Sequence, residues 1–300
     1  MNAIDSLFTS APLGLDDTQS RADARHLPIQ RVGIQGLRHP VRIATADGRT
    51  QATVARFTMD VGLPEHVKGA HMSRFAEIVN ALDRPLDPHA FRALEAHMRK
   101  RLDAATGRLE MRFTWFREKV APVSGARSLL DVDATWIART DAAGRSRLDL
   151  EVVVPVTSLC PCSKTISDYG AHNQRAHITI RAEAGSRLEL DELIDIAEAQ
   201  ASSELYGVLK RVDEKHVTER AYDNPKFVED LVRDIALACQ AHDEIGEFMV
   251  ASENFESIHN HSAYAELHGR GRLQPRSGLQ ARLPAQGPRK HAPKPAAQGG

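Results

Sequence analysis

The chain has 300 residues, of which 42% are hydrophobic and 26% are charged, and its formal net charge is −1. This composition is typical of a globular protein with a sizeable core, and the balanced charge gives no overall field that favours nucleic acid or a strongly acidic partner. The start lacks a basic segment followed by an apolar run, and no apolar run reaches the roughly eighteen residues of a membrane span. We therefore expect a cytoplasmic protein with no nucleic-acid or membrane partner.

The sequence contains three cysteines, Cys160, Cys162 and Cys239. This number is odd and too small to provide a disulfide framework for a chain of this length. It is typical of a reducing compartment, in which thiols serve metals or catalysis.

Both ends of the chain are polar and lack sustained hydrophobic periodicity. Residues 1–27 form one such segment, and residues 269–300 form another that holds seven Lys or Arg and no acid. We predict that both segments are disordered. We interpret the basic tail as solubilising, because it lacks the aromatic residues that stack on bases.

Residues 28–140 form the first predicted unit, with the element order ββααββ. Alternating apolar residues predict its four strands, at 31–44, 51–61, 109–115 and 130–138. Apolar residues at helical spacing, in two pieces, predict two helices between the second and third strands. The second of these helices is predicted to start at Asp87 and Pro88, because Asp caps a helix N-terminus and proline fits its first position.

Residues 141–268 form the second predicted unit, which repeats the order of elements without detectable sequence identity. Its strands are predicted at 147–156, 175–183, 247–256 and 261–267. One helix is predicted through 190–212, and another is predicted to begin at Asn224 and Pro225. The pattern therefore predicts an α+β fold of two tandem units, with helices on one face of antiparallel sheets.

The stretch from Val156 to His177 leaves an apolar strand and becomes rich in Cys, Ser, His, Asp and Asn. Loops at strand ends are where functional sites are built. Cys160 and Cys162 are followed by His172 within reach of a returning loop, and thiolate with imidazole is a zinc-type ligand set. Cys-x-Cys differs from the usual Cys-x-x-Cys clamp, so two small buried residues at a turn explain this segment equally well.

Three further groups of titratable residues lie in the second unit. Glu256, His259 and His261 are predicted on or beside a strand, whose alternation places the two histidines on one face. Taken singly, each histidine is more often a surface residue than a ligand. Glu214 follows the predicted helix end, where a solvated helix terminus is the simpler interpretation. Glu229, near the start of the next helix, lies beside its apolar stripe and can point into a cleft.

Four separated segments resemble, in the right order, the type IB class of GTP cyclohydrolase I. They are KGAHMSRF at 68–75, PVTSLCPCSKTISDYGAHNQRAH at 155–177, YDNPKFVEDLVR at 222–233 and ENFESIHNHSAYA at 253–265. The resemblance extends over about residues 28–268. It implies the tunnelling fold, in which ββααββ units assemble sheets into a barrel, with two units in each chain of a homotetramer.

The resemblance also implies the chemistry and the residues that perform it. GTP is the implied substrate, with a divalent metal ion, Mn²⁺, Zn²⁺ or Fe²⁺, and without an organic cofactor. The implied metal-site residues are Cys160, His172, Glu214, Glu256 and His259. The implied catalytic residues are Cys160, His172, Cys162, His259 and His261, the last three as candidates for moving protons. The implied substrate contacts are Glu229 to the guanine ring and Lys68, His71 and Arg74 to the triphosphate. The three triphosphate contacts can belong to the same chain or to a neighbouring subunit.

Two other hypotheses stay open at this point. A nitrile reductase of the same fold would use Cys160 or Cys162 as a nucleophile and NADPH as the hydride source, although the His172, Glu214 and His259 set argues against it. A non-catalytic, metal-stabilised protein would have a closed ligand shell and no need for Glu229. The motifs of phosphate loops, dinucleotide-binding folds and zincins are absent from the sequence.

Overall fold

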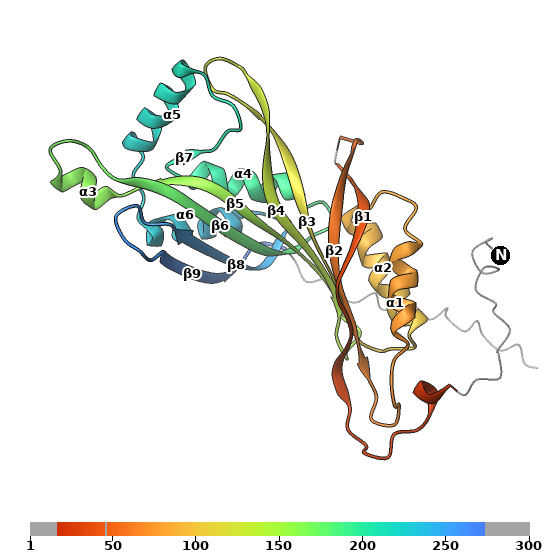
Figure 1. Ribbon diagram of the computed structural model, residues 1–300. Coiled ribbons are helices and arrows are strands. Elements are labelled where there is room, and N and C mark those ends of the chain that lie inside the picture. The colour runs from red at the N-terminus through yellow and green to blue at the C-terminus, as the bar shows by residue number, and fades with distance from the viewer. Residues whose placement is uncertain (1–16, 46, 274–300) are drawn as a thin grey trace, which may run out of the picture.

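The computed structural model describes residues 17–45 and 47–273. Its centre is one antiparallel sheet with the strand order β1-β2-β3-β4-β5-β6-β8-β9, and the short β7 pairs with β5. In Figure 1, α1 and α2 lie beside one half of the sheet, and α4 and α6 lie beside the other half. The arrangement confirms the predicted α+β class.

The sheet runs without interruption through both predicted units. Its strands are β1 (Ile29–Ala44), β2 (Thr50–Leu63), β3 (Gly107–Val120), β4 (Arg127–Thr140), β5 (Ser146–Leu159), β6 (Asn173–Ala184), β7 (Ser203–Glu204), β8 (Ile245–Asn254) and β9 (Ala263–Arg270). The helices are η1 (Thr18–Ser20, a 3-10 turn), α1 (Met72–Asn80), α2 (Pro88–Arg101), α3 (Pro161–Ile166), α4 (Leu190–Gln200), α5 (Arg211–Asp223) and α6 (Val228–Ala241). Within the described residues, none of these helices is long and apolar enough to cross a membrane.

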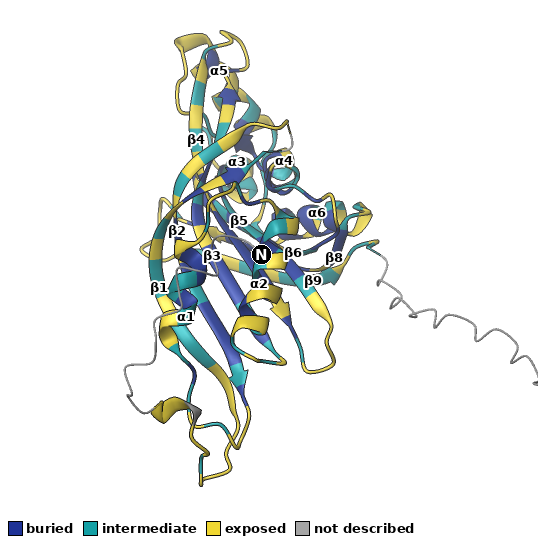
Figure 2. Cartoon of the chain, turned by 90° about the vertical axis from the view of Figure 1, so that its right-hand side faces the viewer, coloured by how far each residue is buried: buried dark blue, intermediate teal, exposed yellow. Residues whose placement is uncertain are grey.

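The core lies between the sheet and the helices, as the dark blue residues in Figure 2 show. The ring of Trp136 in β4 meets Phe91 of α2 and Phe113 of β3 edge-on, with centroids 5.6 and 5.5 Å apart. In β5, the fully buried Val152 and Val154 alternate with partly exposed residues. This period of two turns one set of strand side chains towards the helices.

The first half of the chain confirms the predicted element order, β1-β2-α1-α2-β3-β4. Asp87 caps α2 as expected, because its Oδ1 accepts a hydrogen bond of 2.6 Å from the Ala90 N–H. Pro88 occupies the first helical position, where its missing N–H leaves no intrahelical bond unmade.

The single helix predicted through 190–212 is wrong, because the chain forms α4, β7 and α5 in this region. Helix α4 ends at Gln200, and its C-cap residue Ala201 has an extended ψ of 160°. Ser203 and Glu204 then pair with β5 opposite Thr157 and Val156. Periodicity along one segment cannot report this pairing, since it depends on a strand about fifty residues away.

Two other predicted boundaries are also corrected. Asn224 is the C-cap of α5 rather than the N-cap of the last helix, and its Nδ2 donates to the Ala201 carbonyl at 2.8 Å. That last helix, α6, begins after Phe227. Glu256 and His261, predicted in strands, lie in the connection between β8 and β9.

The two ends predicted to be disordered lie partly within the described residues, and their disorder stays a prediction. Residues 17–27 contain η1, and their backbone bonds to the chain after β2, from the Asp23 N–H to the His66 carbonyl at 3.1 Å and from the Lys68 N–H to the Arg21 carbonyl at 3.2 Å. At the other end, Arg270 closes β9. Residues 1–16 and 274–300 lie outside the described residues.

Candidate active site

Three strand ends bring the main candidate residues to the same end of the sheet. Leu159, the last residue of β5, pairs with Asn173, the first residue of β6. Asn254, the last residue of β8, pairs with Ala176 of β6. Cys160, His172 and Glu256 therefore follow or precede strands that are hydrogen-bonded neighbours. Figure 1 shows α3 and the β8–β9 connection at this end of the molecule.

Cys160 occupies the N-cap of the short helix α3. Its N–H donates to the His172 carbonyl at 3.1 Å, so the backbone itself joins these two candidate residues. Its Sγ accepts a hydrogen bond from the Ser163 N–H at 3.5 Å. Cys162, two residues on, is exposed, so the alternative of two buried residues at a turn is wrong.

His172 is oriented by a chain of polar contacts. Its Nδ1 lies 3.0 Å from Gln174 Oε1 and 3.8 Å from Glu256 Oε2, while Gln174 Nε2 donates to Glu256 Oε1 at 3.4 Å. A carboxylate only accepts, so the amide nitrogen of Gln174 must face Glu256 and its oxygen must face His172. In the tautomer with its proton on Nδ1, His172 donates to Gln174 Oε1 and has its Nε2 lone pair open to a ligand, as in metal-binding histidines.

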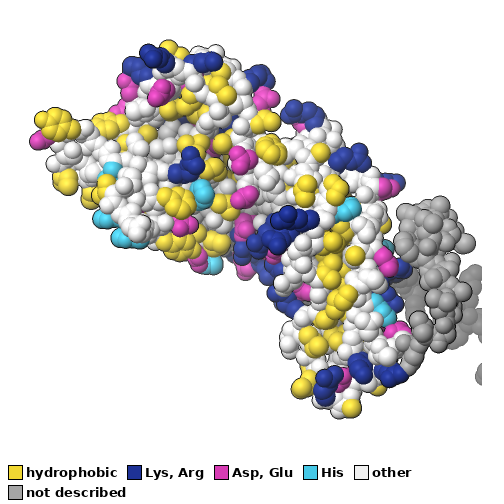
Figure 3. All heavy atoms as spheres, viewed as in Figure 1, with side chains coloured by type: hydrophobic (Ala, Val, Ile, Leu, Met, Phe, Trp, Pro, Cys, Tyr) yellow, Lys and Arg dark blue, Asp and Glu magenta, His cyan; other side chains and the backbone are white. Residues whose placement is uncertain are grey.

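The connection between β8 and β9 carries the other two histidines. His259 and His261 are exposed, and their rings stack with centroids 5.0 Å apart and an interplanar angle of 9°. The sequence predicted them as alternate residues of a strand, but they lie in the connection between β8 and β9, which still places their rings together. His259 N–H lies 3.4 Å from the Glu256 carbonyl, which joins the pair to the His172 contacts. In Figure 3, His side chains gather on the surface at this end.

Glu214 lies on α5, which is anchored through its buried neighbour Asp213. The Asp213 carboxylate accepts from the N–H groups of Val123 and Ser124, from the Ser124 hydroxyl and from the Lys210 N–H, at 2.6–2.9 Å. Burial raises the pKa of Asp213, but these four hydrogen bonds outweigh burial and hold it well below its usual range. The first turn of α5 is thereby fixed on the β3–β4 turn, and Glu214 is exposed there.

The start of α6 also lies beside the Cys160 end of the sheet. The Lys226 N–H donates to the Leu159 carbonyl at 3.0 Å, next to Cys160 in the chain. Glu229 follows in the first turn of α6 and is exposed. A position on the surface at this end suits contact with a ligand.

Lys68, His71 and Arg74 lie in a different part of the chain, between β2 and α1 and in the first turn of α1. Figure 1 shows α1 and α3 at opposite sides of the molecule. His71 Nε2 lies 3.3 Å from Asp17 Oδ2, and Arg74 donates to the Arg101 carbonyl at 3.4 Å. One chain therefore does not bring this set to Cys160.

Across residues 17–45 and 47–273, the structure forms no group of three or more His, Cys, Asp or Glu that could hold a metal ion. His172 and Glu256 are together, and Cys160 is joined to them through the backbone. The set of five metal-site residues therefore stays a prediction. Gln174, which orients His172, was missed because a glutamine in a strand carries no sequence signal of that role.

Comparison with known proteins identifies the family. Residues 15–265 match the family described as type I GTP cyclohydrolase folE2. The chain is 57% identical over 269 residues to GTP cyclohydrolase FolE2 1 of Dechloromonas aromatica, an alignment that covers 90% of this chain and 99% of that protein. It is 51% identical over 260 residues to GTP cyclohydrolase FolE2 of Azoarcus sp., covering 87% of this chain and 97% of that one.

The chain therefore belongs to the type I GTP cyclohydrolase FolE2 family, which confirms the resemblance seen in the four segments. Among solved structures, uricase from Arthrobacter globiformis aligns with a TM-score of 0.43 and 11% identity, covering 85% of this chain and 96% of that one.

The third cysteine differs from the pair at the site. Cys239 in α6 is fully buried, and burial raises its pKa to about 12. With His242 it forms a Cys-x-x-His spacing, so the expectation that the chain lacks this motif is wrong. A thiol that is both inaccessible and protonated is a poor ligand and a poor nucleophile, so this spacing is structural.

We predict that Ellman's reagent modifies two thiols per native chain at pH 8, those of Cys160 and Cys162, because the thiolate is the reactive form and both residues reach the surface. Unfolding in guanidinium chloride should release the third thiol, Cys239. Mass spectrometry of the labelled peptides identifies the residues, and rapid modification of Cys239 in the native protein would contradict the structure.

Proposed function

We propose that the chain is a GTP cyclohydrolase I, which converts GTP and water to 7,8-dihydroneopterin 3′-triphosphate and formate as the first step of pterin and tetrahydrofolate synthesis. The observation that carries the proposal is the family match over residues 15–265. The arrangement at the Cys160 end of the sheet supports it, because a thiol, an imidazole and a carboxylate are held there by neighbouring strands.

The chemistry requires water at two stages. One water adds to guanine C8, and a second hydrolyses the resulting formamide to formate. Rearrangement of the opened ribose and closure of the pterin ring return one water, so the net reaction consumes one. The protein must therefore deliver water to C8 and move protons to and from the ring nitrogens.

We propose that Cys160, His172 and Glu214 hold a divalent ion, Mn²⁺, Zn²⁺ or Fe²⁺, with Glu256 and His259 at or beside it. A bound ion would act as a Lewis acid and lower the pKa of a water molecule towards neutral pH. His172 can contribute to such a site, since Gln174 and Glu256 engage Nδ1 and leave Nε2 for a ligand. A mixed set of sulfur, nitrogen and oxygen donors suits all three metals.

Proton movement falls to the titratable groups around His172. Glu256 lies beside its ring, and the stacked His259 and His261 can pass protons to solvent because they are exposed. The exposed thiol of Cys162 is a further candidate. In this proposal, Cys160 acts as a ligand rather than as a nucleophile.

Substrate binding draws on two separated parts of the fold. We propose that Glu229 accepts hydrogen bonds from the guanine N–H groups, and that Lys68, His71 and Arg74 neutralise the triphosphate. The second set lies across the molecule from α3, so a second copy of the chain would have to supply it. This supports a homo-oligomer, which we propose is a tetramer, and we propose that it acts in the cytoplasm.

We predict that the purified protein, supplied with Mn²⁺ and GTP, releases formate and yields a fluorescent pterin after oxidation. The nitrile-reductase alternative predicts instead that NADPH is oxidised when a nitrile is supplied. The non-catalytic alternative predicts neither. Absence of formate under conditions in which the protein is folded and metal-loaded would reject the proposal.

Glu229→Ala should mainly raise KM for GTP. Its loss leaves guanine donors without their acceptor, a penalty of about 1–3 kcal/mol. Asp230→Ala is the matched control, since Asp230 lies in the same first turn and carries the same charge. Equal effects of the two substitutions on KM would show that Glu229 acts through helix stability alone.

A further inference from the structure

The face of the sheet that points away from the helices, which we call the bare face, carries a row of three arginines. Arg38 of β1, Arg56 of β2 and Arg112 of β3 are direct neighbours in the strand register, and all three are exposed. The residues on either side of Arg56, Ala55 and Phe57, are fully buried in the core. Like charges directly opposite each other in neighbouring strands repel, so this row costs stability unless an anion offsets it.

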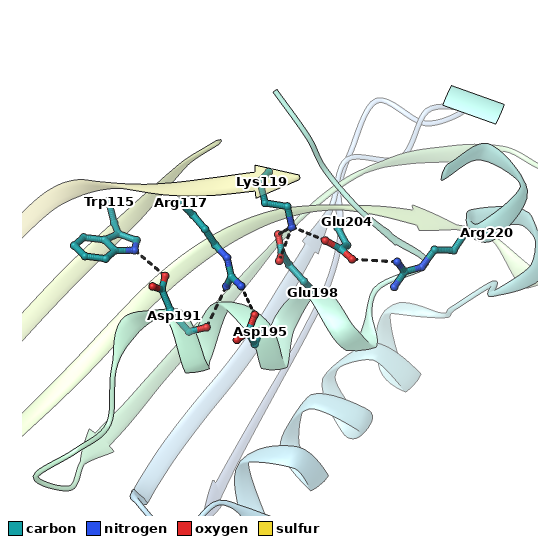
Figure 4. A network of polar contacts seen from close by, with 8 residues as sticks. All are labelled: Trp115, Arg117, Lys119, Asp191, Asp195, Glu198, Glu204 and Arg220. Carbon is teal, nitrogen blue, oxygen red and sulfur yellow. Dashed lines mark hydrogen bonds and ion pairs between the residues drawn. The ribbon is translucent and has the colours of Figure 1, made fainter. Parts of the chain in front are cut away.

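The cations of β3 that point towards the helices are, by contrast, matched by carboxylates. Lys119 Nζ donates to both carboxylate oxygens of Glu198 on α4 at 2.8 Å, and also to Glu204 of β7. Arg117, two residues earlier, pairs with Asp195 on α4. Figure 4 shows these carboxylates pointing towards the two cations. The bare face departs from this pattern.

The carboxylates beside the arginine row are already engaged by other contacts. Glu110 accepts from Arg112 Nε at 2.6 Å and from Arg108. Burial acts to raise the pKa of Glu110, but these two arginines outweigh burial and lower it. Asp60 accepts two hydrogen bonds from Arg31, of 2.9 and 2.6 Å. Two carboxylates thus serve three arginines and have little left for the rest of the row.

Arg38 and Arg56 are left without an acidic partner. Among the residues that the structure places, neither side chain forms a hydrogen bond or an ion pair. Gly36, in a β-bulge of β1, has a φ of +78°, and a Cβ there would lie 3.4 Å from Arg56 Nε. Glycine therefore allows the Arg56 guanidinium to lie close over the β1 backbone. The five arginines and two carboxylates around the row leave a surplus of three positive charges.

The row lies along a concave part of the bare face. Two adjoining hollows, of about 560 and 600 Å³, share Arg56 and Arg112 in their lining, and the larger one also includes Arg38. Asp133 of β4 and Glu151 of β5 line the far side of the larger hollow. The positive surplus is therefore confined to the part formed by β1, β2 and β3.

We propose that Arg38, Arg56 and Arg112 form a binding site for a phosphate chain, either inorganic or carried by a nucleotide, that is separate from the residues around Cys160. Guanidinium groups bind phosphate oxygens through paired hydrogen bonds. Opposed residues of antiparallel strands lie about 5 Å apart, so the row extends over about 10 Å. This spacing favours linked phosphates, which can contact more than one guanidinium group, over a single phosphate.

The test is Arg56→Gln, with Arg181→Gln as the matched control. Arg181 lies in the same row of the bare face, three strands beyond Arg112, but it is paired with Glu151. Binding of inorganic pyrophosphate is measured by titration calorimetry in low salt without added divalent ions. All chains also carry Lys68→Ala and Arg74→Ala, which remove two of the proposed triphosphate contacts.

We expect Arg56→Gln to bind pyrophosphate at least about tenfold more weakly, since a charged hydrogen-bond donor is lost. Arg38→Gln should show the same loss, and Arg181→Gln should stay within about twofold. Without pyrophosphate, Arg56→Gln should melt no lower than its parent, because the substitution relieves repulsion in the row. With pyrophosphate, the parent should melt higher, because the anion binds the folded state. Equal affinity for ADP would show that the phosphate chain alone is recognised, and tighter binding of ADP would assign a nucleotide.

Absence of pyrophosphate binding to the parent chain would overturn the proposal, and so would an equal loss in Arg181→Gln, which would indicate general surface charge. A lower melting temperature of Arg56→Gln without pyrophosphate would also overturn it, since Arg56 would then serve the fold. In the otherwise unchanged chain, Arg56→Gln should leave KM for GTP unchanged, and a raised KM would place Arg56 in the substrate site instead.

Discussion

The pairing of β5 with β6 is the constraint on which the rest of the site depends. Its register sets Leu159 opposite Asn173, so the residues just beyond each strand, Cys160 and His172, must meet. A slip of one residue would turn the buried valines of β5 away from the helices, and this penalty holds the register. The pairing of β6 with β8 then brings Glu256 to the same end. A hydrophobic pattern thus determines where three polar groups lie.

The sequence could predict features that are encoded locally. Alternation located the strands of the first half, and Asp87 with Pro88 marked the start of α2. The break between α4 and α5 could not be predicted in this way. It depends on β7 pairing with β5 and on Asp213 accepting hydrogen bonds from the β3–β4 turn, about ninety residues earlier. A helical pattern reports neither contact.

The candidate site shows the same division. The motif around Cys160 and His172 could be found in the sequence, because Cys and His are rare and chemically distinctive. The residue that orients His172 is an ordinary polar residue, Gln174, whose role exists only in the folded chain. The sequence therefore indicates which residues are candidate metal ligands, whereas their relative positions depend on strand register and on buried charged residues. In addition, α1 and α3 lie on different sides of the chain, so the proposed triphosphate contacts are far from the residues around Cys160.

The central claim is that Cys160 and His172 act together as ligands at the end of β5 and β6. Crystals grown with Zn²⁺ and measured on both sides of the zinc absorption edge test it directly. The account predicts one strong anomalous peak per chain, about 2.3 Å from Cys160 Sγ and about 2.1 Å from His172 Nε2. A peak that involves neither residue, or zinc bound to His172 through Nδ1, would contradict the account.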